Sequence, residues 1–226
     1  MNSQVQTFAI RRSIKEYLNR EIKQMLNLDK RALELPQLIL ASGSPRRAEI
    51  LTSVGWPFQV RIPDVDETEN AGESPDEYVI RLAEEKAATI ANAFQESLIL
   101  AADTTVVIED QILGKPRDRE DAVRMISTLS GATHQVLTGI AILKNGTCRT
   151  GLQKTSVRFR KMTDNEVDFL VDKGDPYDKA GGYAVQAQAA LFIEGIEGDY
   201  WNVVGLPINL VYTLVNELCH QFGRSA

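Results

Sequence analysis

The residues with the clearest chemical potential follow an apolar run at 38–41. A Ser-Gly-Ser sequence at 42–44 ends this run, and Pro45, Arg46 and Arg47 lead into a helical pattern of apolar residues. Ser44 is a favourable N-cap, and Pro45 suits the first helical position, where its missing N–H is not needed. Free backbone N–H groups at a helix N-terminus would then lie beside two guanidinium groups, an arrangement that binds phosphate. The alternative is an ordinary capped helix with two solvated arginines.

Two carboxylates are candidates for metal binding and proton transfer. Asp103 follows the apolar run at 99–102, where we expect a buried strand to end, and Glu67 lies in an acidic loop at 64–72. Ligand sites in open α/β sheets lie at the carboxyl ends of strands. A carboxylate in that place can bind Mg²⁺ or Mn²⁺, or accept a proton from water. The alternatives are a capping role for Asp103 and a solvated surface position for Glu67.

Three further polar residues are candidate ligand contacts. Lys115 stands between Gly114 and Pro116, and Lys86 lies in the helical pattern that follows the acidic loop. Either ammonium group would supply a point charge to a polyphosphate, although a solvated surface lysine is the more common case. The amide of Gln186 can both donate and accept hydrogen bonds at the edge of a base, and a polar residue at a loop margin is its alternative.

The motifs that the chain lacks narrow the class of reaction. The sequence has no GxxxxGK[ST] phosphate-binding loop and no GxSxG nucleophile motif. The two histidines, His134 and His220, and the two cysteines, Cys148 and Cys219, are too few and too scattered for a zinc site. They also give little support to a serine or cysteine triad. The chemistry that remains is a metal-assisted attack of water on a phosphoanhydride.

Composition indicates a globular protein with one sizeable core. The chain has 226 residues, of which 43% are hydrophobic and 25% charged, and its formal net charge is -6. This acidic balance argues against nucleic acid or an anionic membrane as the main partner, so an anionic ligand requires a local cluster of basic groups. No apolar run approaches the roughly 20 residues needed to cross a bilayer. The few cysteines, without a CxxC spacing, favour a cytoplasmic protein.

The first 35 residues differ in character from the rest of the chain. Apolar residues recur there at helical spacing, at Ile10, Ile14, Leu18, Ile22 and Met25. This pattern predicts an amphipathic helical extension over 1–35 that docks on the body of the protein or on a second subunit. A cleaved transit peptide is the alternative, and the acidic residues of the segment count against it. We therefore expect the main domain to span 36–222.

Strand and helix patterns alternate along this main domain. Strands are predicted at 38–41, 58–62, 98–102, 105–108, 111–113, 136–143, 148–159 and 190–196, and helices at 74–94, 118–129, 163–171 and 208–222, in addition to the one that starts near Arg47. The dipeptide Asn145-Gly146 predicts a hairpin turn between two of the strands. The order of elements predicts an α/β fold with a mixed twisted sheet, in two lobes around a central cleft.

Several short motifs, taken together and in this order, resemble the Maf family of nucleoside triphosphate pyrophosphatases. They are LASGSPRR at 40–47, Asp66-Glu67, LAEEKA at 82–87, Ala102-Asp103-Thr104, GKPR at 114–117, LSG at 129–131, HQVLT at 134–138, DKAGGY at 178–183 and GLP at 205–207. The resemblance covers about residues 37–220. The N-terminal extension departs from it, because the family usually begins near the strand at 38.

The resemblance implies a fold similar to the inosine triphosphate pyrophosphatases and a homodimer. It implies cleavage of a nucleoside triphosphate between the α- and β-phosphates, with Mg²⁺ or Mn²⁺ as cofactor. By motif, Asp103 resembles the proton acceptor that activates water, and Glu67 and Asp103 resemble metal-site carboxylates. The remaining matches are Lys86 and Lys115 as catalytic residues and Ser42, Ser44, Arg46, Arg47, Thr104 and Gln186 as substrate contacts.

Three of these positions, Arg46, Thr104 and Gln186, resemble those that select the substrate in the family. Their combination resembles the subgroup that hydrolyses dTTP and UTP, so the expected substrates are these and related pyrimidine triphosphates. Gln186 would pair with O4 and N3–H of a pyrimidine, and an amide matched to one edge is left unpaired by the wrong base. The alternatives are 7-methyl-GTP or another modified nucleotide as substrate, and a nucleotide-binding regulator of septum formation.

Overall fold

The computed structural model describes residues 34–223, with side chains as far as Cys219. The helix predicted within 1–35 falls outside the described residues, so the N-terminal extension stays a prediction. From Pro36 onward the chain forms one compact unit.

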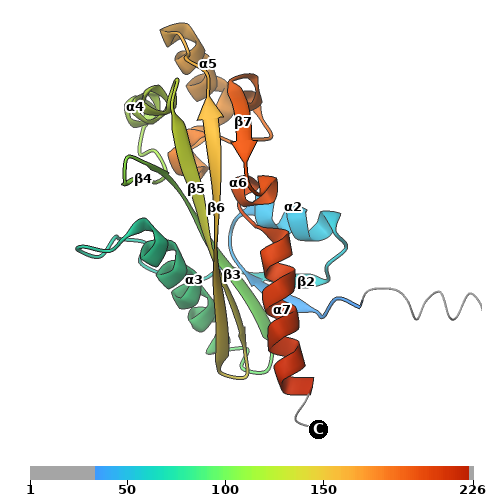
Figure 1. The fold of residues 1–226 in the computed structure, drawn as a ribbon. Helices are drawn as coiled ribbons and strands as arrows, with labels where there is room; N and C mark the ends of the chain where they lie inside the picture. The colour runs from blue at the N-terminus through green and yellow to red at the C-terminus, as the bar shows by residue number, and fades with distance from the viewer. Residues whose placement is uncertain (1–33, 224–226) are drawn as a thin grey trace, which may run out of the picture. The chain divides into compact units, whose positions relative to one another are not determined.

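One mixed sheet forms the centre of this unit. Within the described residues its seven strands are β1 (Leu38–Ala41), β2 (Phe58–Arg61), β3 (Leu98–Ile108), β4 (Gln111–Leu113), β5 (Thr133–Lys144), β6 (Thr147–Phe159) and β7 (Ile193–Glu197). Their order is β2-β1-β3-β5-β6-β7, with β4 paired to β3 (Figure 1). Strand β1 is parallel to β2 and β3, and the other pairs are antiparallel. The predicted mixed α/β sheet is confirmed.

The helices begin at the residues that favour helix starts. They are α2 (Pro45–Ser53), α3 (Pro75–Ala91), α4 (Arg119–Leu129), α5 (Asp164–Gly174), α6 (Tyr200–Val204) and α7 (Ile208–Gly223), with 3₁₀ turns η1 (Pro176–Asp178), η2 (Ala180–Gly182) and η3 (Gln188–Leu191). At the start of α3, the Ser74 hydroxyl accepts from the Glu77 N–H while the Glu77 carboxylate accepts from the Ser74 N–H. This reciprocal pair satisfies two backbone donors and is the capping box that the sequence predicts.

Helices α3 and α7 cover opposite faces of the sheet (Figure 1). Gly139 of β5 lies so close to α3 that a Cβ there would be 2.2 Å from the carbonyl oxygen of Val79. Gly151 of β6 lies against Leu210 of α7, where a Cβ would meet the Leu210 side chain at 3.0 Å. Gly151 pairs with Ile140, the residue after Gly139, and successive residues of a strand face opposite sides. The two glycines therefore bring one helix onto each face.

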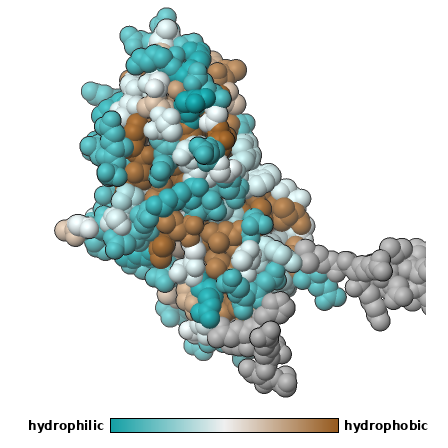
Figure 2. Space-filling model, viewed as in Figure 1, coloured by the Kyte–Doolittle hydropathy of each residue, from teal (hydrophilic) through white to brown (hydrophobic). Residues whose placement is uncertain are grey.

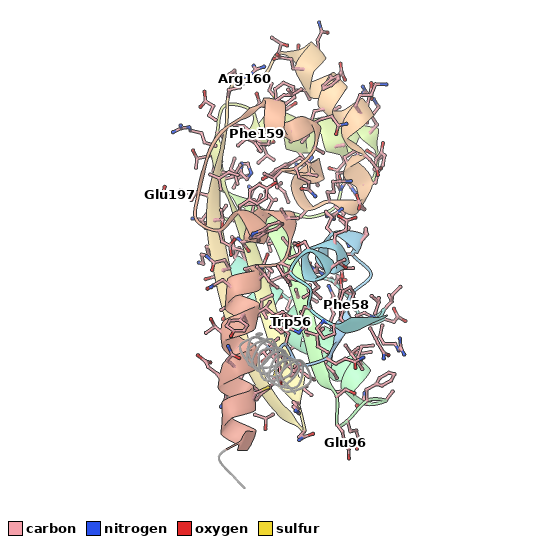
Figure 3. All side chains as sticks on the ribbon, turned by 90° about the vertical axis from the view of Figure 1, so that its right-hand side faces the viewer. Trp56, Phe58, Glu96, Phe159, Arg160 and Glu197 are labelled. Carbon is pink, nitrogen blue, oxygen red and sulfur yellow. The ribbon has the colours of Figure 1, made fainter. Side chains whose placement is uncertain are left out.

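The long hairpin of β5 and β6 connects two groups of elements. Helix α3 lies along one half of the hairpin with β1 and β2, and α4, α5 and β7 surround the other half (Figure 1). From the side, Phe159 and Arg160 lie in the upper half and Trp56, Phe58 and Glu96 in the lower half (Figure 3). The predicted two lobes are thus two groups of elements that share one sheet.

The surface mixes polar and apolar residues. On the face that Figure 2 shows, hydrophobic residues gather in several separate patches between hydrophilic ones. Among the residues that the structure describes, no helix has both the length and the apolar character that a membrane span requires.

Several predicted boundaries were wrong. The strand expected to end before Asp103 continues to Ile108 as β3, because its antiparallel pairing with β5 extends from Ile99 to Val107. The strand expected at 190–196 begins only at Ile193, because η3 occupies 188–191. Helix α3 ends at Ala91 rather than near Phe94. The sequence pattern predicts neither α6 nor the 3₁₀ turns, which are too short to show a periodicity.

Candidate active site

A cavity of about 700 Å³ lies where β1 ends and α2 begins, and we call it the central cavity. This volume is in the usual range for small-molecule sites. Both groups of elements contribute to its wall. It is lined by all ten candidate residues of the sequence analysis, namely Ser42, Ser44, Arg46, Arg47, Glu67, Lys86, Asp103, Thr104, Lys115 and Gln186.

A gap in the sheet makes room for the central cavity. Along one edge of β3, pairing with β1 ends at Ala101, and pairing with β4 begins only at Val106. Strand β5 occupies the other edge of β3 throughout. In the described part of the chain, residues 102–105 therefore have no strand beside them on the first edge. Because successive side chains point to opposite faces, Asp103 and Thr104 reach the cavity from the two sides of the sheet.

On the α3 side of the sheet, Lys86 lies between two carboxylates. Its Nζ is 2.6 Å from Glu67 Oε1 and 2.6 Å from Asp103 Oδ1. Lys86 and Asp103 are buried, whereas Glu67 belongs to the exposed loop before α3. Lys115 Nζ approaches the second oxygen of Glu67, Oε2, at 3.4 Å. These four residues, which we call the lysine–carboxylate cluster, balance two positive charges with two negative ones.

The lysines keep Glu67 ionised. Burial would raise the pKa of the Glu67 carboxyl, but hydrogen bonds and charges from Lys86 and Lys115 bring it below its usual value. Tyr78 of α3 also lines the cavity, and its hydroxyl donates to the backbone oxygen of Glu67 at 2.9 Å. Burial and the negative charges of Asp103 and Glu67 raise the pKa of Tyr78. At neutral pH the Glu67 carboxylate is therefore charged, and the Tyr78 hydroxyl beside it is neutral.

Glu67 and Asp103 are the carboxylates that could hold a divalent cation. Among the described residues, no group of three or more histidine, cysteine, aspartate or glutamate side chains is arranged to hold a metal ion. Mg²⁺ is commonly bound by one or two carboxylates together with the phosphates of a substrate. Glu67 and Asp103 provide two carboxylates that already converge on one positive charge. This donor set suits Mg²⁺ or Mn²⁺ completed by phosphate oxygens.

On the other side of the sheet, Arg47 fixes several parts of the cavity wall. Its buried guanidinium donates from Nε to the Gly205 carbonyl at 2.9 Å, and from its two terminal nitrogens to Ser42 Oγ and Thr104 Oγ1 at 3.0 Å each. Thr104 Oγ1 also lies 2.9 Å from Thr138 Oγ1. Burial lowers the pKa of Arg47, but from an ordinary value so high that the group stays charged. Arg47 thus holds Ser42 and Thr104 in place.

Helix α2 begins at the residues that the sequence predicts. Ser44 is the N-cap residue and Pro45 occupies the first turn, although the Ser44 hydroxyl makes no capping hydrogen bond. The Ser44 N–H donates instead to Ser42 Oγ at 3.1 Å. The Ser44 hydroxyl is therefore not engaged by the helix that it caps, and Ser44, Pro45, Arg46 and Arg47 all line the cavity.

Arg46 connects α2 to the η1 turn across the central cavity. Its guanidinium donates to Asp178 Oδ2 at 2.7 Å and to the Asp178 carbonyl oxygen at 3.0 Å. Lys179 forms a second ion pair with the same carboxylate, and Tyr177 lines the cavity beside them. In the sequence, Asp178 and Lys179 stand out only as members of the DKAGGY motif, and Tyr177 directly precedes it, without a pattern that indicates their roles. That motif is the signal that points to this segment.

His134 contributes structure rather than chemistry. It is buried, its Nε2 lies 2.7 Å from the Tyr183 hydroxyl, and it is not part of the cavity wall. Burial lowers its pKa to about 4, so the imidazole is neutral at neutral pH.

Comparison with known proteins identifies the family. A family model described as Maf-like protein matches residues 37–218. The "dTTP/UTP pyrophosphatase" of Symbiobacterium thermophilum is 44% identical over 189 residues, which are 84% of this chain and 95% of that protein. A protein of the same name from Desulforamulus reducens is 47% identical over 174 residues, 76% of this chain and 91% of that protein.

A solved structure shows a more distant similarity. The Ham1 protein of Staphylococcus aureus has 16% sequence identity and a TM-score of 0.39, over 55% of this chain and 72% of that one. The family match covers most of the described domain and all ten cavity residues named above. The chain therefore belongs to the Maf family.

Proposed function

We propose that the protein hydrolyses dTTP and UTP to the nucleoside monophosphate and pyrophosphate. The observation that carries this proposal is that relatives of this name match more than three quarters of the chain at 44% and 47% identity. The central cavity supports it, because four cationic side chains predicted to contact the substrate line it together with two carboxylates. Those cations are Arg46, Arg47, Lys86 and Lys115. They compensate locally for the net charge of -6, which would otherwise repel a triphosphate.

In the proposed reaction, Asp103 acts as the general base. A water molecule attacks the α-phosphorus, and Asp103 takes the proton that the water loses. The bond between the α-phosphorus and the oxygen that bridges to the β-phosphate breaks, and pyrophosphate leaves with that electron pair. Lys86 Nζ lies 2.6 Å from Asp103 Oδ1, and this ion pair fixes the Asp103 carboxylate before the substrate binds. Lys86 and Lys115 also offset the negative charge that develops on the phosphates.

A divalent cation, when bound, would neutralise phosphate charge and polarise the phosphoryl group. We propose that Glu67 and Asp103 hold it together with the phosphates of the substrate. The convergence of both carboxylates on Lys86 Nζ, at 2.6 Å each, supports this assignment.

We propose that phosphate groups bind at the first turn of α2. Ser42, Ser44 and Arg47 line the cavity there, and a helix N-terminus beside a guanidinium favours an anion. The base would be selected by Arg46, Thr104 and Gln186. Gln186 is exposed on the cavity wall, so its amide is available to a ligand. Thr104 takes part through the network that Arg47 and Thr138 hold in place.

We also propose a cytoplasmic homodimer. The resemblance to the Maf family implies the dimer, and the few cysteines without a CxxC spacing favour the cytoplasm. Neither nucleic acid nor a membrane is expected as a partner because of the acidic charge balance. Sedimentation of the full-length protein measures the number of subunits directly, and a single monomeric species at micromolar concentration would contradict the dimer.

A panel of nucleoside triphosphates tests the function. Purified protein is incubated with Mg²⁺ or Mn²⁺ and dTTP, UTP, CTP, ATP, GTP or 7-methyl-GTP, and monophosphate and pyrophosphate are measured separately. We expect both products in equal amounts from dTTP and UTP. Release of orthophosphate, or preferential turnover of 7-methyl-GTP, would contradict the proposal. The absence of any turnover would favour the regulatory alternative.

A further inference from the structure

The proposed reaction leaves two charged residues of the central cavity without a role. Asp178 and Lys179 line the cavity next to Arg46, on the η1 turn and directly after it. The reacting phosphates are assigned to the lysine–carboxylate cluster, which consists of other residues on other elements. The Arg46–Asp178–Lys179 group, which we call the mouth cluster, therefore faces a different part of the ligand.

The contacts within the mouth cluster are directional. Arg46 donates one terminal N–H to Asp178 Oδ2 at 2.7 Å and the other to the Asp178 carbonyl oxygen at 3.0 Å. Two donors fixed on one residue define both the position and the plane of the guanidinium. The Lys179 side chain is 11% exposed, and its ammonium group donates to Asp178 Oδ1 and to the Asp175 carbonyl oxygen. The Asp178 carboxylate is therefore itself held in place.

Asp178 stays ionised, so it can hold the Arg46 guanidinium by an ion pair. Burial would raise the pKa of its carboxyl, but hydrogen bonds and charges from Lys179 and Arg46 bring it below its usual value. The Asp178 side chain is still 50% exposed and that of Arg46 is 20% exposed, so both remain accessible to a ligand. The ion pair with Asp178 thus leaves the Arg46 guanidinium partly exposed at the wall of the cavity.

The surroundings of the mouth cluster suit a nucleoside more than a phosphate chain. Tyr177, whose side chain is about half exposed, lies directly before Asp178, and the amide of Gln186 lies on the same cavity wall. An aromatic ring can stack on a base and an amide can pair with its edge. The negative charge of Asp178 would also oppose a phosphate placed beside it.

We propose that Asp178 is a positioning residue that fixes Arg46 at the nucleoside end of the cavity, so that Arg46 discriminates pyrimidine from purine triphosphates. This inference rests on the proposed function and adds a determinant of base selection to it. Asp178 acts through Arg46 and not on the reacting phosphates, so its loss affects recognition rather than the chemical step.

Steady-state kinetics of Asp178→Asn with UTP, dTTP and ATP tests the inference. We expect KM for UTP and dTTP to rise about fivefold while kcat stays within about twofold, since the interaction lost is one of binding. The preference for UTP over ATP in kcat/KM should fall about tenfold, because a misplaced guanidinium no longer rejects the wrong base. Asp178→Glu, which keeps the charge and an acceptor, should recover part of the preference.

Two further variants separate positioning from other effects. In an Arg46→Ala background, Asp178→Asn should change neither KM nor the preference further, because the two residues act as one unit. Asp110→Asn is the matched control: it removes the same charge from the turn between β3 and β4, where the residue is exposed and does not line the cavity. Asn tolerates the positive φ of 61° at this position. This control should behave as the wild type.

The outcomes are distinguishable. If Asp178→Asn lowers KM for all triphosphates, its carboxylate acts only as a repulsive charge and the inference is overturned. Additive effects of Asp178→Asn and Arg46→Ala would overturn it as well, as would an unchanged base preference. If the wild type hydrolyses no nucleotide, the proposed function fails and the inference falls with it, whereas normal turnover by the wild type confines any failure to the inference.

Discussion

At the scale of single residues, the lysine–carboxylate cluster explains why a lysine is buried beside the cavity. Lys86 is 7% exposed and Asp103 is 8% exposed, and each compensates the charge of the other at 2.6 Å. Removal of one partner of a buried pair leaves an uncompensated charge, which typically costs about 3–5 kcal/mol. We propose that the same ammonium group acts on the substrate, so stability and activity should both depend on it.

Replacement of Lys86 by methionine should therefore affect both properties. We expect turnover of UTP to fall about 100-fold, because a fixed positive charge is lost from the reacting centre. The midpoint of thermal unfolding should fall as well, since Asp103 is left buried without its cation. Lys115→Met is the comparison: the Lys115 side chain is 58% exposed and 3.4 Å from Glu67, so its loss should leave the unfolding midpoint nearly unchanged. Equal loss of stability in both variants would contradict this difference.

The ionisation of Glu67 makes the stability of the fold depend on pH. Its pKa is lower in the folded protein than the value of about 4.3 for a free glutamate, so it stabilises the fold above that value and loses this contribution as the pH falls through the lower folded pKa. Glu67→Gln should therefore lose less stability than the wild type between about pH 5 and pH 3. Chemical denaturation across this range measures the difference. Parallel stability curves for the two proteins would show that Glu67 is not held by the lysines.

The metal assignment of Glu67 makes a separate prediction. Glu67→Gln should raise the concentration of Mg²⁺ or Mn²⁺ needed for half-maximal turnover about tenfold, because one negatively charged ligand is lost. Titration of each metal at a fixed concentration of UTP measures this value. An unchanged titration curve would remove Glu67 from the metal site.

Only some of the cavity residues can be identified as site residues from the sequence. Residues within one motif, such as Ser42 to Arg47, or directly beside a strand, such as Asp103, can be identified from local pattern. Asp178 could not be given a role, because its contact with Arg46 joins positions 132 residues apart and depends on the whole fold. The ion pair of Lys86 with Asp103 is also invisible in the sequence, which shows only a lysine in a helical pattern.

At the scale of elements, the gap beside β3 is what creates the site. Sequence predicts an interruption at Asp103 because charged and hydroxyl residues follow an apolar run. The strand nevertheless continues, since β5 supplies a partner from Ile99 to Val107, and the interruption occurs on the opposite edge of β3, between β1 and β4. A strand boundary depends on long-range pairing, whereas helix starts such as Ser74–Glu77 are set by adjacent residues and were predicted correctly.

The close contact of α3 with β5 gives a prediction at this scale. Gly139→Ala would place a Cβ 2.2 Å from the backbone oxygen of Val79, so α3 must shift and carry Lys86 with it. We expect a destabilisation of about 1–3 kcal/mol and reduced turnover. Gly195→Ala in β7 is the control, because its Cβ would meet nothing closer than 3.7 Å, at the end of the flexible Arg158 side chain. Denaturant unfolding of both variants measures the difference, and equal stabilities would contradict the predicted contact.

At the scale of the whole molecule, the two groups of elements meet at the central cavity. The first turn of α2 and the lysine–carboxylate cluster line the cavity together with residues from the segment 177–186. A ligand that bridges them stabilises the folded state by mass action. The mixed sheet and the alternation of elements were predicted from periodicity, but the convergence of both groups on one cavity follows only from the tertiary structure.

Binding of nucleotide should therefore raise the unfolding temperature. A UTP analogue with a non-hydrolysable link between the α- and β-phosphates, at 100 times its Kd, should add about 2.7 kcal/mol of stability. For a domain of this size this corresponds to a rise of roughly 5–10 °C in Tm. Thermal unfolding with and without the analogue measures it, with Mg²⁺ present in both samples. An unchanged Tm at saturation would contradict a cavity that both groups of elements share.

The role of Asp103 as the general base is tested most directly by product formation from UTP with Asp103→Asn beside the wild type. We predict that the wild type releases equal amounts of UMP and pyrophosphate. The variant should be at least about 10³-fold slower, because its amide cannot take the proton from water. The Asp103→Asn protein should still unfold cooperatively and still bind the non-hydrolysable analogue, which shows that the cavity is intact. Turnover by the variant close to that of the wild type would contradict the assignment of Asp103 as the general base and with it the proposed mechanism.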